Sequence, residues 1–288
     1  MSANNISIIK ADHNAPYIRV DLNIEYECYE TNKLNIHIIR PSADESARFP
    51  LIVFSQGSSW FKQDMGKEII QLSSFAKRGF VIGLAEYRSV NESGFPAQII
   101  DTNSATRFLI RNADKYNIDI NNIFLWGTSS GGHTVLMCGL TKELKDFSKE
   151  DILQQPINYK AIIDYYGPTD ITKLVPEEEA YKYAGIDSPL PLLINNDNIW
   201  HAPEITDKLI PMNYIDEKRK CPPILIIHGL ADTMVNHQQS IDLYDDMIKK
   251  GQNAKLILLE DANHGGGCFW TDDILNEIEK FIRGVINP

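Results

Sequence analysis

Residues 127–132 read Gly-Thr-Ser-Ser-Gly-Gly and contain the pattern Gly-x-Ser-x-Gly. The apolar run before them, residues 123–126, is typical of a buried strand, and residues 133–138 are typical of a buried helix. A turn that joins a strand directly to a helix is so sharp that only small residues fit beside its serine, and the serine hydroxyl is left exposed at the tip. Ser129 is therefore a candidate nucleophile.

A serine hydroxyl attacks a carbonyl group only when a base takes its proton, and the base must be oriented by an acid. In a doubly wound sheet, active groups gather at the carboxyl ends of the strands. Asp232 follows the predicted strand at residues 224–228, and His264 follows the predicted strand at residues 255–259. We predict that His264 is the base and that Asp232 orients it, in the chain order serine, acid, histidine.

Other interpretations of these residues remain open. Asp232 could cap the helix that follows it, and His264 taken alone could be a surface or capping residue. Asp164 is the main rival acid, and Asp170 is a weaker rival. Three further histidines lie inside predicted strands or a helix, where we expect packing or hydrogen-bonding roles: His37, His133 and His228.

Acyl transfer places negative charge on the former carbonyl oxygen, so backbone N–H groups must already point to it, and each such donor is worth about 3–4 kcal/mol. The N–H of Ser130, directly after the nucleophile, is one predicted donor. The second is expected from the loop after the third predicted strand, residues 55–60, where Ser58 or Gly57 would donate. An ordinary glycine-serine turn is the alternative.

Five aromatic residues stand in or near these loops, and together they could line a substrate pocket suited to aryl or sugar esters. Packing is the alternative for each of them. The predicted substrate-binding residues are Trp60, Tyr87, Tyr166, Trp200 and Trp270.

The scaffold that must position these groups is predicted to contain eight strands: residues 17–24, 34–40, 51–55, 80–86, 123–126, 161–166, 224–228 and 255–259. The first two alternate polar and apolar residues, which indicates an edge region with antiparallel pairing. The later strands are short continuous apolar runs, which is typical of strands buried on both faces.

Helix-like segments alternate with the later strands, at residues 65–78, 96–116, 237–250 and 271–285. This alternation predicts an α/β fold: a doubly wound, mostly parallel eight-stranded sheet with helices on both faces, in a single domain spanning residues 1–288. Residues 171–220 interrupt the rhythm with five prolines separated by apolar residues. We expect this segment to be a cap-like insertion over the site.

The formal net charge of −11 argues against nucleic acid or an anionic membrane as a partner, because both require a basic surface. No stretch approaches the roughly 18 apolar residues of a membrane span. Residues 1–13 lack the apolar core of a signal peptide, so a cytoplasmic location is expected unless an export signal has been removed.

The four cysteines, at positions 28, 138, 221 and 268, are widely separated and form no Cys-x-x-Cys pair. We expect free thiols in a reduced compartment. No clustered spacing of metal ligands is present, so neither a metal nor an organic cofactor is predicted. The predicted partner is a small-molecule ester, and a homodimer is kept as an option because the sequence does not decide the oligomeric state.

The chain resembles α/β-hydrolase-fold serine esterases and lipases related to hormone-sensitive lipase and to acetyl-xylan and feruloyl esterases. The resemblance runs from about residue 34 to the end and rests on residues 54–60, 85–88, 95–98, 126–133 and 166–170 and on the Asp232 and His264 loops. It implies an α/β-hydrolase sheet and the hydrolysis of short-chain acyl esters, such as acetyl or aryl esters of carbohydrates, through an acyl-enzyme on Ser129.

One departure from the family concerns the loop at residues 56–60. The family usually has His-Gly-Gly-Gly-Trp there, whereas this chain has Gln-Gly-Ser-Ser-Trp. Serines still donate backbone N–H groups where their φ and ψ suit non-glycine residues, so an oxyanion hole is expected with an altered shape and substrate range. Two alternatives remain: an amidase, peptidase or formamidase with the same triad, or a ligand-binding protein of this fold that does not hydrolyse.

Overall fold

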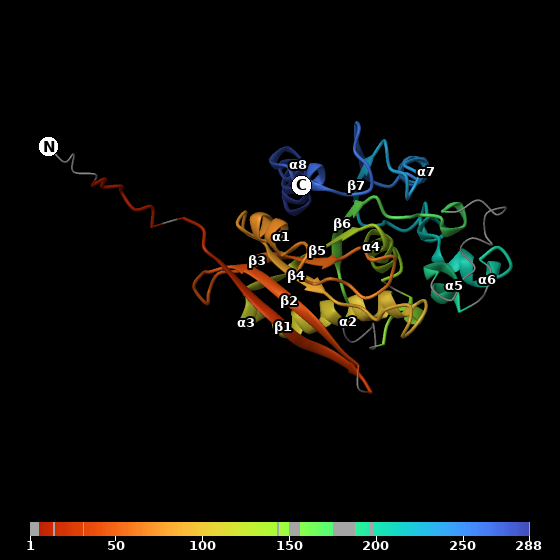
Figure 1. Ribbon diagram of the computed structural model, residues 1–288, viewed down its shortest axis with the longest axis horizontal. Helices are drawn as coiled ribbons and strands as arrows, with labels where there is room; N and C mark the ends of the chain where they lie inside the picture. Colours follow the sequence, from red (N-terminus) through yellow and green to blue (C-terminus); the bar gives the residue numbers. More distant parts are fainter. Residues whose placement is uncertain are drawn as a thin grey trace.

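The computed structural model describes residues 6–13, 15–30, 32–142, 144–149, 156–174, 188–195 and 199–287. Within these ranges eight strands form one sheet in the order β1-β2-β4-β3-β5-β6-β7-β8, so all eight predicted strands are present (Figure 1). Their bounds are β1 Ile18–Tyr29, β2 Asn32–Pro41, β3 Phe49–Ser55, β4 Val81–Ala85, β5 Ile118–Thr128, β6 Tyr159–Tyr165, β7 Ile224–Gly229 and β8 Ala254–Leu259.

The pairing of the strands agrees with their sequence patterns. β2 is antiparallel to both β1 and β4, whereas β4, β3, β5, β6, β7 and β8 are mutually parallel. β3 shows why the central strands contain apolar runs: Leu51 and Val53 belong to the core on one face, and Ile52 and Phe54 to the core on the other. The carboxyl ends of β5, β7 and β8 therefore meet at one edge of the sheet.

Helices cover both faces of the sheet, as predicted. α1 (Ile69–Ala76) and α8 (Asp272–Ile286) pack on one face, and α2 (Ala97–Arg111), α4 (Ser130–Leu140) and α7 (Gln238–Lys249) on the other (Figure 1). The remaining short helices are α3 Ala113–Tyr116, η1 Lys145–Phe147, η2 Ile171–Lys173, α5 Pro189–Ile194, α6 Pro203–Thr206, η4 Asp207–Leu209, η5 Pro211–Tyr214 and η6 Gly267–Trp270.

The single helix predicted over residues 96–116 is in fact two, α2 and α3. Asn112 separates them, and its side-chain amide donates to the carbonyl oxygen of Phe108 at 2.8 Å. An asparagine that bonds back to the preceding turn offers the backbone an alternative to continued helix, which explains the break.

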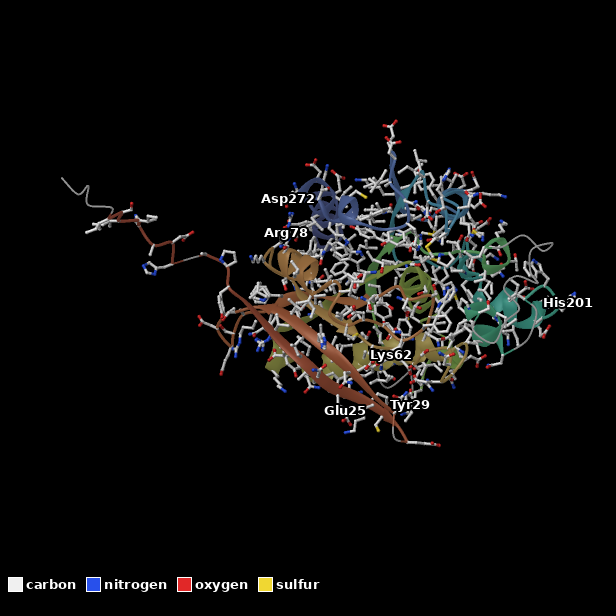
Figure 2. All side chains as sticks on the ribbon, viewed as in Figure 1. Glu25, Tyr29, Lys62, Arg78, His201 and Asp272 are labelled. Carbon is white, nitrogen blue, oxygen red and sulfur yellow. The ribbon has the colours of Figure 1, made fainter. Side chains whose placement is uncertain are left out.

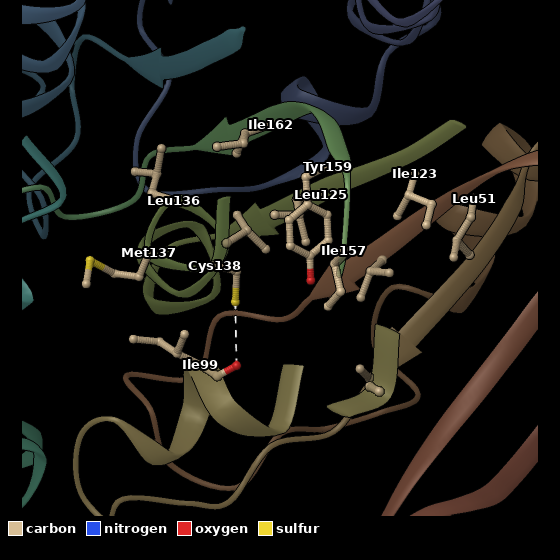
Figure 3. Close-up of a cluster of buried hydrophobic side chains, with 14 of the residues drawn as sticks. Leu51, Ile99, Ile123, Leu125, Leu136, Met137, Cys138, Ile157, Tyr159 and Ile162 are labelled. Carbon is tan, nitrogen blue, oxygen red and sulfur yellow. Dashed lines mark hydrogen bonds between the residues drawn. The ribbon is translucent and has the colours of Figure 1, made fainter. Parts of the chain in front are cut away.

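The helix α4, which begins directly after Ser129, packs against a dense apolar cluster. Figure 3 shows Leu136, Met137 and Cys138 of this helix against strand residues such as Leu125 and Ile162. All five side chains are completely buried. Because core packing tolerates little change in volume, this contact fixes the position of the helix relative to the sheet.

On the opposite face, Arg78 at the end of the α1 segment reaches across to α8. Its guanidinium lies 3.2 Å from a carboxylate oxygen of Asp272 and 3.2 Å from one of Glu279 (Figure 2). These ion pairs are largely at the surface, so each contributes little to stability, but together they align α8 with α1.

Part of the insertion predicted over residues 171–220 lies outside the described residues, namely 175–187 and 196–198. Its described part forms a small apolar core of its own with Trp60 and Val90 of the main domain. The His133 ring of α4 bonds to the carbonyl oxygen of Leu209 at 2.8 Å and ties this segment to the nucleophile helix. None of the helices in the described ranges has the length and apolar character needed to cross a membrane.

Candidate active site

Ser129 lies between β5 and α4, at the sharp turn that the motif predicts. Its φ is 52° and its ψ is −126°, a strained conformation for a residue with a side chain. A Cβ atom at Gly127 would lie 2.2 Å from the carbonyl oxygen of Gly131, and one at Gly131 would lie 2.1 Å from that of Ser55. No side chain fits at either glycine, so the motif is a steric requirement of this turn.

The structure brings Ser129, His264 and Asp232 into one hydrogen-bonded chain. The Ser129 hydroxyl lies 2.8 Å from His264 Nε2, and His264 Nδ1 lies 2.6 Å from Asp232 Oδ2. A carboxylate accepts only, so Nδ1 carries the proton and donates it to Asp232. The lone pair of Nε2 therefore faces the serine hydroxyl, and the imidazole is in the tautomer that a general base needs.

The Asp232 carboxylate is completely buried and fully hydrogen-bonded. Its Oδ1 accepts from the backbone N–H groups of Met234 at 2.8 Å and Val235 at 2.9 Å. Burial alone raises the pKa of Asp232, but the hydrogen bonds from His228 and His264 outweigh it and hold that pKa below its ordinary value. Asp232 is thus an anion that stabilises positive charge on His264.

His228, for which the sequence analysis predicted only a packing or hydrogen-bonding role inside a strand, contacts the same acid. Its Nε2 lies 3.1 Å from Asp232 Oδ2 and 2.9 Å from the carbonyl oxygen of Val235, and its Nδ1 lies 2.6 Å from Ser240 Oγ. Two acceptors at Nε2 put the proton there, so Nδ1 accepts from the Ser240 hydroxyl. The chain folds back directly after β7, which brings two residues four positions apart into contact. The spacing from His228 to Asp232 was therefore the sequence feature that could have indicated this contact.

The two rival acids have other partners. Asp164 is completely buried at the end of β6 and accepts from the N–H of Gly167 at 3.1 Å. Asp170 accepts from the N–H of Thr172 at 3.1 Å and caps the η2 turn. Within the described part of the chain, Asp232 is the carboxylate that bonds to His264.

Asp164 makes the stability of the fold depend on pH. Burial raises its pKa to about 7, against smaller opposing effects of His228 and of the Gly167 N–H. An aspartate in an unfolded chain titrates near about 3.9, so between the two values the folded state binds more protons than the unfolded state. The contribution of Asp164 to the free energy of unfolding therefore falls as the pH rises from about 4 to about 7.

Replacement of Asp164 by asparagine removes this titration while keeping the shape of the side chain. Relative to the unsubstituted protein, the free energy of unfolding of the variant is expected to rise by on the order of 4 kcal/mol between about pH 4 and pH 8. Urea denaturation at the two pH values measures the difference. Asp245→Asn, at an exposed position of α7, controls for loss of a surface charge. A difference that stays constant with pH would contradict the assignment.

In the loop opposite Ser129, the two predicted oxyanion donors are already engaged in other hydrogen bonds. The N–H of Gly57 donates to Thr128 Oγ1 and the N–H of Ser58 donates to Ser130 Oγ, both at 2.9 Å. These two predicted groups are therefore engaged in holding the loop against the nucleophile turn. Gly57 is needed for the close approach, because a Cβ atom there would lie 2.4 Å from the carbonyl oxygen of Thr128.

The next residue, Ser59, is a further candidate donor that the sequence analysis did not name. It lines the cavity beside Ser129 and has φ 53°, and its N–H donates to no acceptor among the described residues. The N–H of Ser130 lies in the first turn of α4, where backbone donors have no partner within the helix. Ser59 and Ser130 are the pair of N–H groups that this geometry leaves for an oxyanion.

Two cavities open at Ser129, and both are also lined by Ser59, Met234 and His264. The first, of about 420 Å³, has a mixed polar and apolar lining, with Lys67, Glu68, Gln71, Tyr166, Gly265, Gly266, Gly267 and Trp270 among its walls. The second, of about 300 Å³, is mostly apolar and has Trp60, Pro168, Leu174, Pro189, Leu190 and Val235 among its walls. Trp60, Tyr166 and Trp270 thus lie where the sequence analysis predicted them.

Tyr87 and Trp200 line neither cavity. Tyr87 is 1% exposed, and its hydroxyl donates to the carbonyl oxygen of Gln56 at 2.9 Å and lies 3.1 Å from Ser58 Oγ. Its buried ring does not reach the surface of the site. Its hydroxyl instead supports residues 56–60, which we call the oxyanion loop. Trp200 packs against the apolar core of the insertion.

Gln56, which replaces the usual histidine, also holds this loop. Its amide donates to the carbonyl oxygen of Asp64 at 2.8 Å and to the buried carboxylate of Glu68. Burial raises the pKa of Glu68, and the hydrogen bond from Gln56 opposes that effect. The glutamine therefore connects the oxyanion loop to the segment just before α1.

Several known proteins are similar to this chain in sequence or in fold. "Esterase LipC" of Mycobacterium tuberculosis is 28% identical over 196 residues, which are 66% of this chain and 46% of the relative. The isoprenylcysteine alpha-carbonyl methylesterase ICME of Arabidopsis thaliana is 23% identical over 90% of this chain and 62% of its own length. The chain thus spans about half of the length of these curated relatives or somewhat more.

Among solved structures, a "truncated form of carbohydrate esterase from gut microbiota" superposes with a TM-score of 0.79 at 27% identity, covering 95% of this chain and 98% of that one. An esterase from Thermogutta terrifontis with propionate bound has a TM-score of 0.71 at 22% identity over 94% of this chain and 95% of its own, a likeness of fold. The predicted resemblance to esterases is confirmed. The profile of the BD-FAE family matches residues 36–247, and the chain belongs to that family.

Proposed function

We propose that this protein is a serine carboxylesterase that hydrolyses short-chain acyl esters through an acyl-enzyme on Ser129. The observation that carries the proposal is the chain of hydrogen bonds from Ser129 through His264 to Asp232, with distances of 2.8 and 2.6 Å. The names of the relatives, which are esterases, support it.

In the acylation step, the Ser129 oxygen attacks the acyl carbon and its proton passes to His264 Nε2. The carbonyl oxygen becomes an oxyanion that accepts from the N–H groups of Ser59 and Ser130. Asp232 stabilises the imidazolium without taking its proton. When the tetrahedral intermediate collapses, the bond to the alcohol oxygen breaks, and His264 gives the proton to that oxygen.

Deacylation repeats this sequence with water as the nucleophile. His264 Nε2 takes a proton from water, the water oxygen attacks the acyl carbon, and the same two N–H groups receive the oxyanion. Collapse of the intermediate breaks the bond to the Ser129 oxygen, which regains its proton from His264. The carboxylic acid then leaves, and every proton is accounted for within the triad.

The apolar cavity is the proposed acyl site. Its walls include Leu174, Pro189 and Leu190, which belong to the insertion, so we propose that residues 171–220 form a cap that closes the acyl side of the site. The hydrogen bond between His133 and Leu209 joins this segment to α4 and so holds the cap in a fixed position relative to Ser129. Burial lowers the pKa of His133 to about 4, so its ring is neutral at neutral pH and donates through Nε2.

A panel of p-nitrophenyl esters that differ in acyl length, together with the matched p-nitroanilides, tests the proposal. Hydrolysis of the short acyl esters is expected, with much slower release from the anilides. Labelling by a fluorophosphonate should add its mass to the peptide that contains Ser129. Equal rates on esters and anilides would instead favour an amidase, and a protein that neither turns over nor labels would be a binding protein of this fold.

His228 is expected to influence turnover through Asp232. His228→Ala removes one donor to a buried carboxylate, and a hydrogen bond to a charged group is worth about 1.5–3 kcal/mol, so kcat should fall roughly 10- to 100-fold. His228→Gln places an amide N–H near the same position and should recover part of the loss. If kcat falls equally in His228→Ala and His228→Gln, or if only the melting temperature changes, the effect of His228 is confined to packing.

A further inference from the structure

We propose that Tyr166 is a positioning residue whose ring holds the imidazole of His264 in line between Asp232 and Ser129. The inference rests on the proposed esterase function and adds the contact through which the fold orients the general base. The rings of Tyr166 and His264 pack edge to face, with 4.6 Å between their centroids and 61° between their planes. This is a favourable geometry for two aromatic rings.

The imidazole of His264 needs support besides its hydrogen bonds. Whenever Ser129 carries an acyl group, its oxygen has no proton to share with Nε2, and the bond from Nδ1 to Asp232 is left to hold the ring. A single hydrogen bond allows a ring to tilt about it. The cavities at Ser129 are both lined by His264, so space is open for such a tilt unless another side chain packs against the ring.

The glycines that follow His264 provide no side chains for this purpose. A Cβ atom at Gly266 or Gly267 would meet no other atom within 4 Å, and the φ angles of Gly265 and Gly266 are 86° and 102°. A Cβ atom at Gly265 would lie 3.1 Å from the hydroxyl oxygen of Tyr166. The side chain of Tyr166 therefore lies against both the ring of His264 and the backbone just after it.

Tyr166 is itself anchored to the rest of the site. Its ring packs edge to face against the fully buried ring of Phe269, with 4.7 Å between centroids. Its N–H donates to the carbonyl oxygen of Ile227 in β7 at 2.9 Å, and the carbonyl oxygen of Tyr165 accepts from the N–H of Ser129 at 2.8 Å. The position of the Tyr166 ring is therefore fixed relative to the nucleophile turn.

The backbone of Tyr166 is strained in a way that a structural role for the main chain alone does not require. Its φ is 43°, in the left-handed region that glycine adopts without a steric cost. A residue with a side chain held there costs on the order of 1–3 kcal/mol, and such strain is concentrated at functional sites. Ser59 and Ser129 of the same site also have positive φ. A side chain at position 166 is thus retained where glycine would fold more easily.

The ring of Tyr166, and not its hydroxyl, is the part that this role requires. Burial raises the pKa of Tyr166 above its ordinary value, so the phenol stays neutral and adds no charge beside the imidazole. Tyr166→Phe should therefore keep nearly the normal kcat on a short-chain p-nitrophenyl ester. Tyr166→Leu should lower kcat about 100-fold, as expected when a catalytic group is displaced by about 1 Å, with KM nearly unchanged.

Labelling by a fluorophosphonate separates this role from that of a substrate wall. The Ser129 oxygen bonds to phosphorus, fluoride leaves, and His264 takes the serine proton, so the rate of labelling depends on the position of His264. The labelling rate constant should fall in Tyr166→Leu in parallel with kcat and should stay normal in Tyr166→Phe. A raised KM with normal labelling in Tyr166→Leu would overturn the inference, and so would an equal loss of kcat in both variants.

Tyr244→Leu is the matched control, because Tyr244 lies on α7 and packs against the apolar core rather than against the site. It should lose stability and keep normal kcat and labelling. Should Tyr166→Leu fail to fold, as judged by circular dichroism, Tyr166→Met fills more of the volume and is measured with the same expectations. Failure of the proposed function is distinguishable, because the unsubstituted protein would then neither hydrolyse the ester nor be labelled at Ser129.

Discussion

Replacement of Ser129 by alanine is expected to lower kcat on a short-chain p-nitrophenyl ester by about 10⁶-fold. The hydroxyl is the atom that forms the covalent intermediate, and neither His264 nor the oxyanion donors can replace it. Ser59 and Ser130 would still polarise the bound carbonyl, so a residual rate above that of the uncatalysed reaction should remain. Initial-rate measurements at known protein concentration determine the loss.

Ser74→Ala is a suitable control, because Ser74 is exposed on α1 and its hydroxyl donates to the carbonyl oxygen of Ile70 at 3.2 Å, within its own helix. This variant should turn over at the normal rate. Circular dichroism and urea unfolding of Ser129→Ala should match those of the unsubstituted protein, since the backbone at position 129 is held by its neighbours. Near-normal turnover in Ser129→Ala would exclude the acyl-enzyme mechanism.

The fold was predictable because its central strands are buried on both faces. Residues 51–54 and 224–227 are continuous apolar runs, and when such runs alternate with helices they are typical of a parallel sheet. The strand order was not predictable in the same way. β3 pairs with β4 and β5 on its two sides, and pairing between distant segments depends on packing of the whole sheet rather than on any local pattern.

The positions of Ser129, Asp232 and His264 followed from a topological rule, since groups after parallel strands meet at one edge. Ser59 and His228 did not follow from it. Whether the N–H of Ser58 is available depends on the Ser130 hydroxyl, 72 positions away in the sequence, and only the folded chain brings the two together. His228 reaches Asp232 because the chain reverses after β7, and a strand pattern alone does not show such a reversal.

Replacement of Asp232 by asparagine is expected to lower kcat by about 10⁴-fold through the tautomer of His264. The backbone N–H groups of Met234 and Val235 require an acceptor at the Oδ1 position, at 2.8 and 2.9 Å. The amide oxygen of asparagine must occupy that position, so its NH₂ group takes the place of Oδ2 and faces His264 Nδ1. The imidazole then carries its proton on Nε2, toward Ser129, and cannot act as a base.

Variants at Asp170 and Asp164 distinguish these two rival acids from Asp232. Asp170→Asn should leave turnover unchanged, because that carboxylate caps η2. Asp164→Asn should change stability with pH much more than it changes kcat. If instead Asp164→Asn abolished turnover and Asp232→Asn did not, the acid of the site would be Asp164. In the Asp232→Asn background, adding His228→Gln should cost little more, because both changes act on the same hydrogen-bonded chain and their effects are not additive.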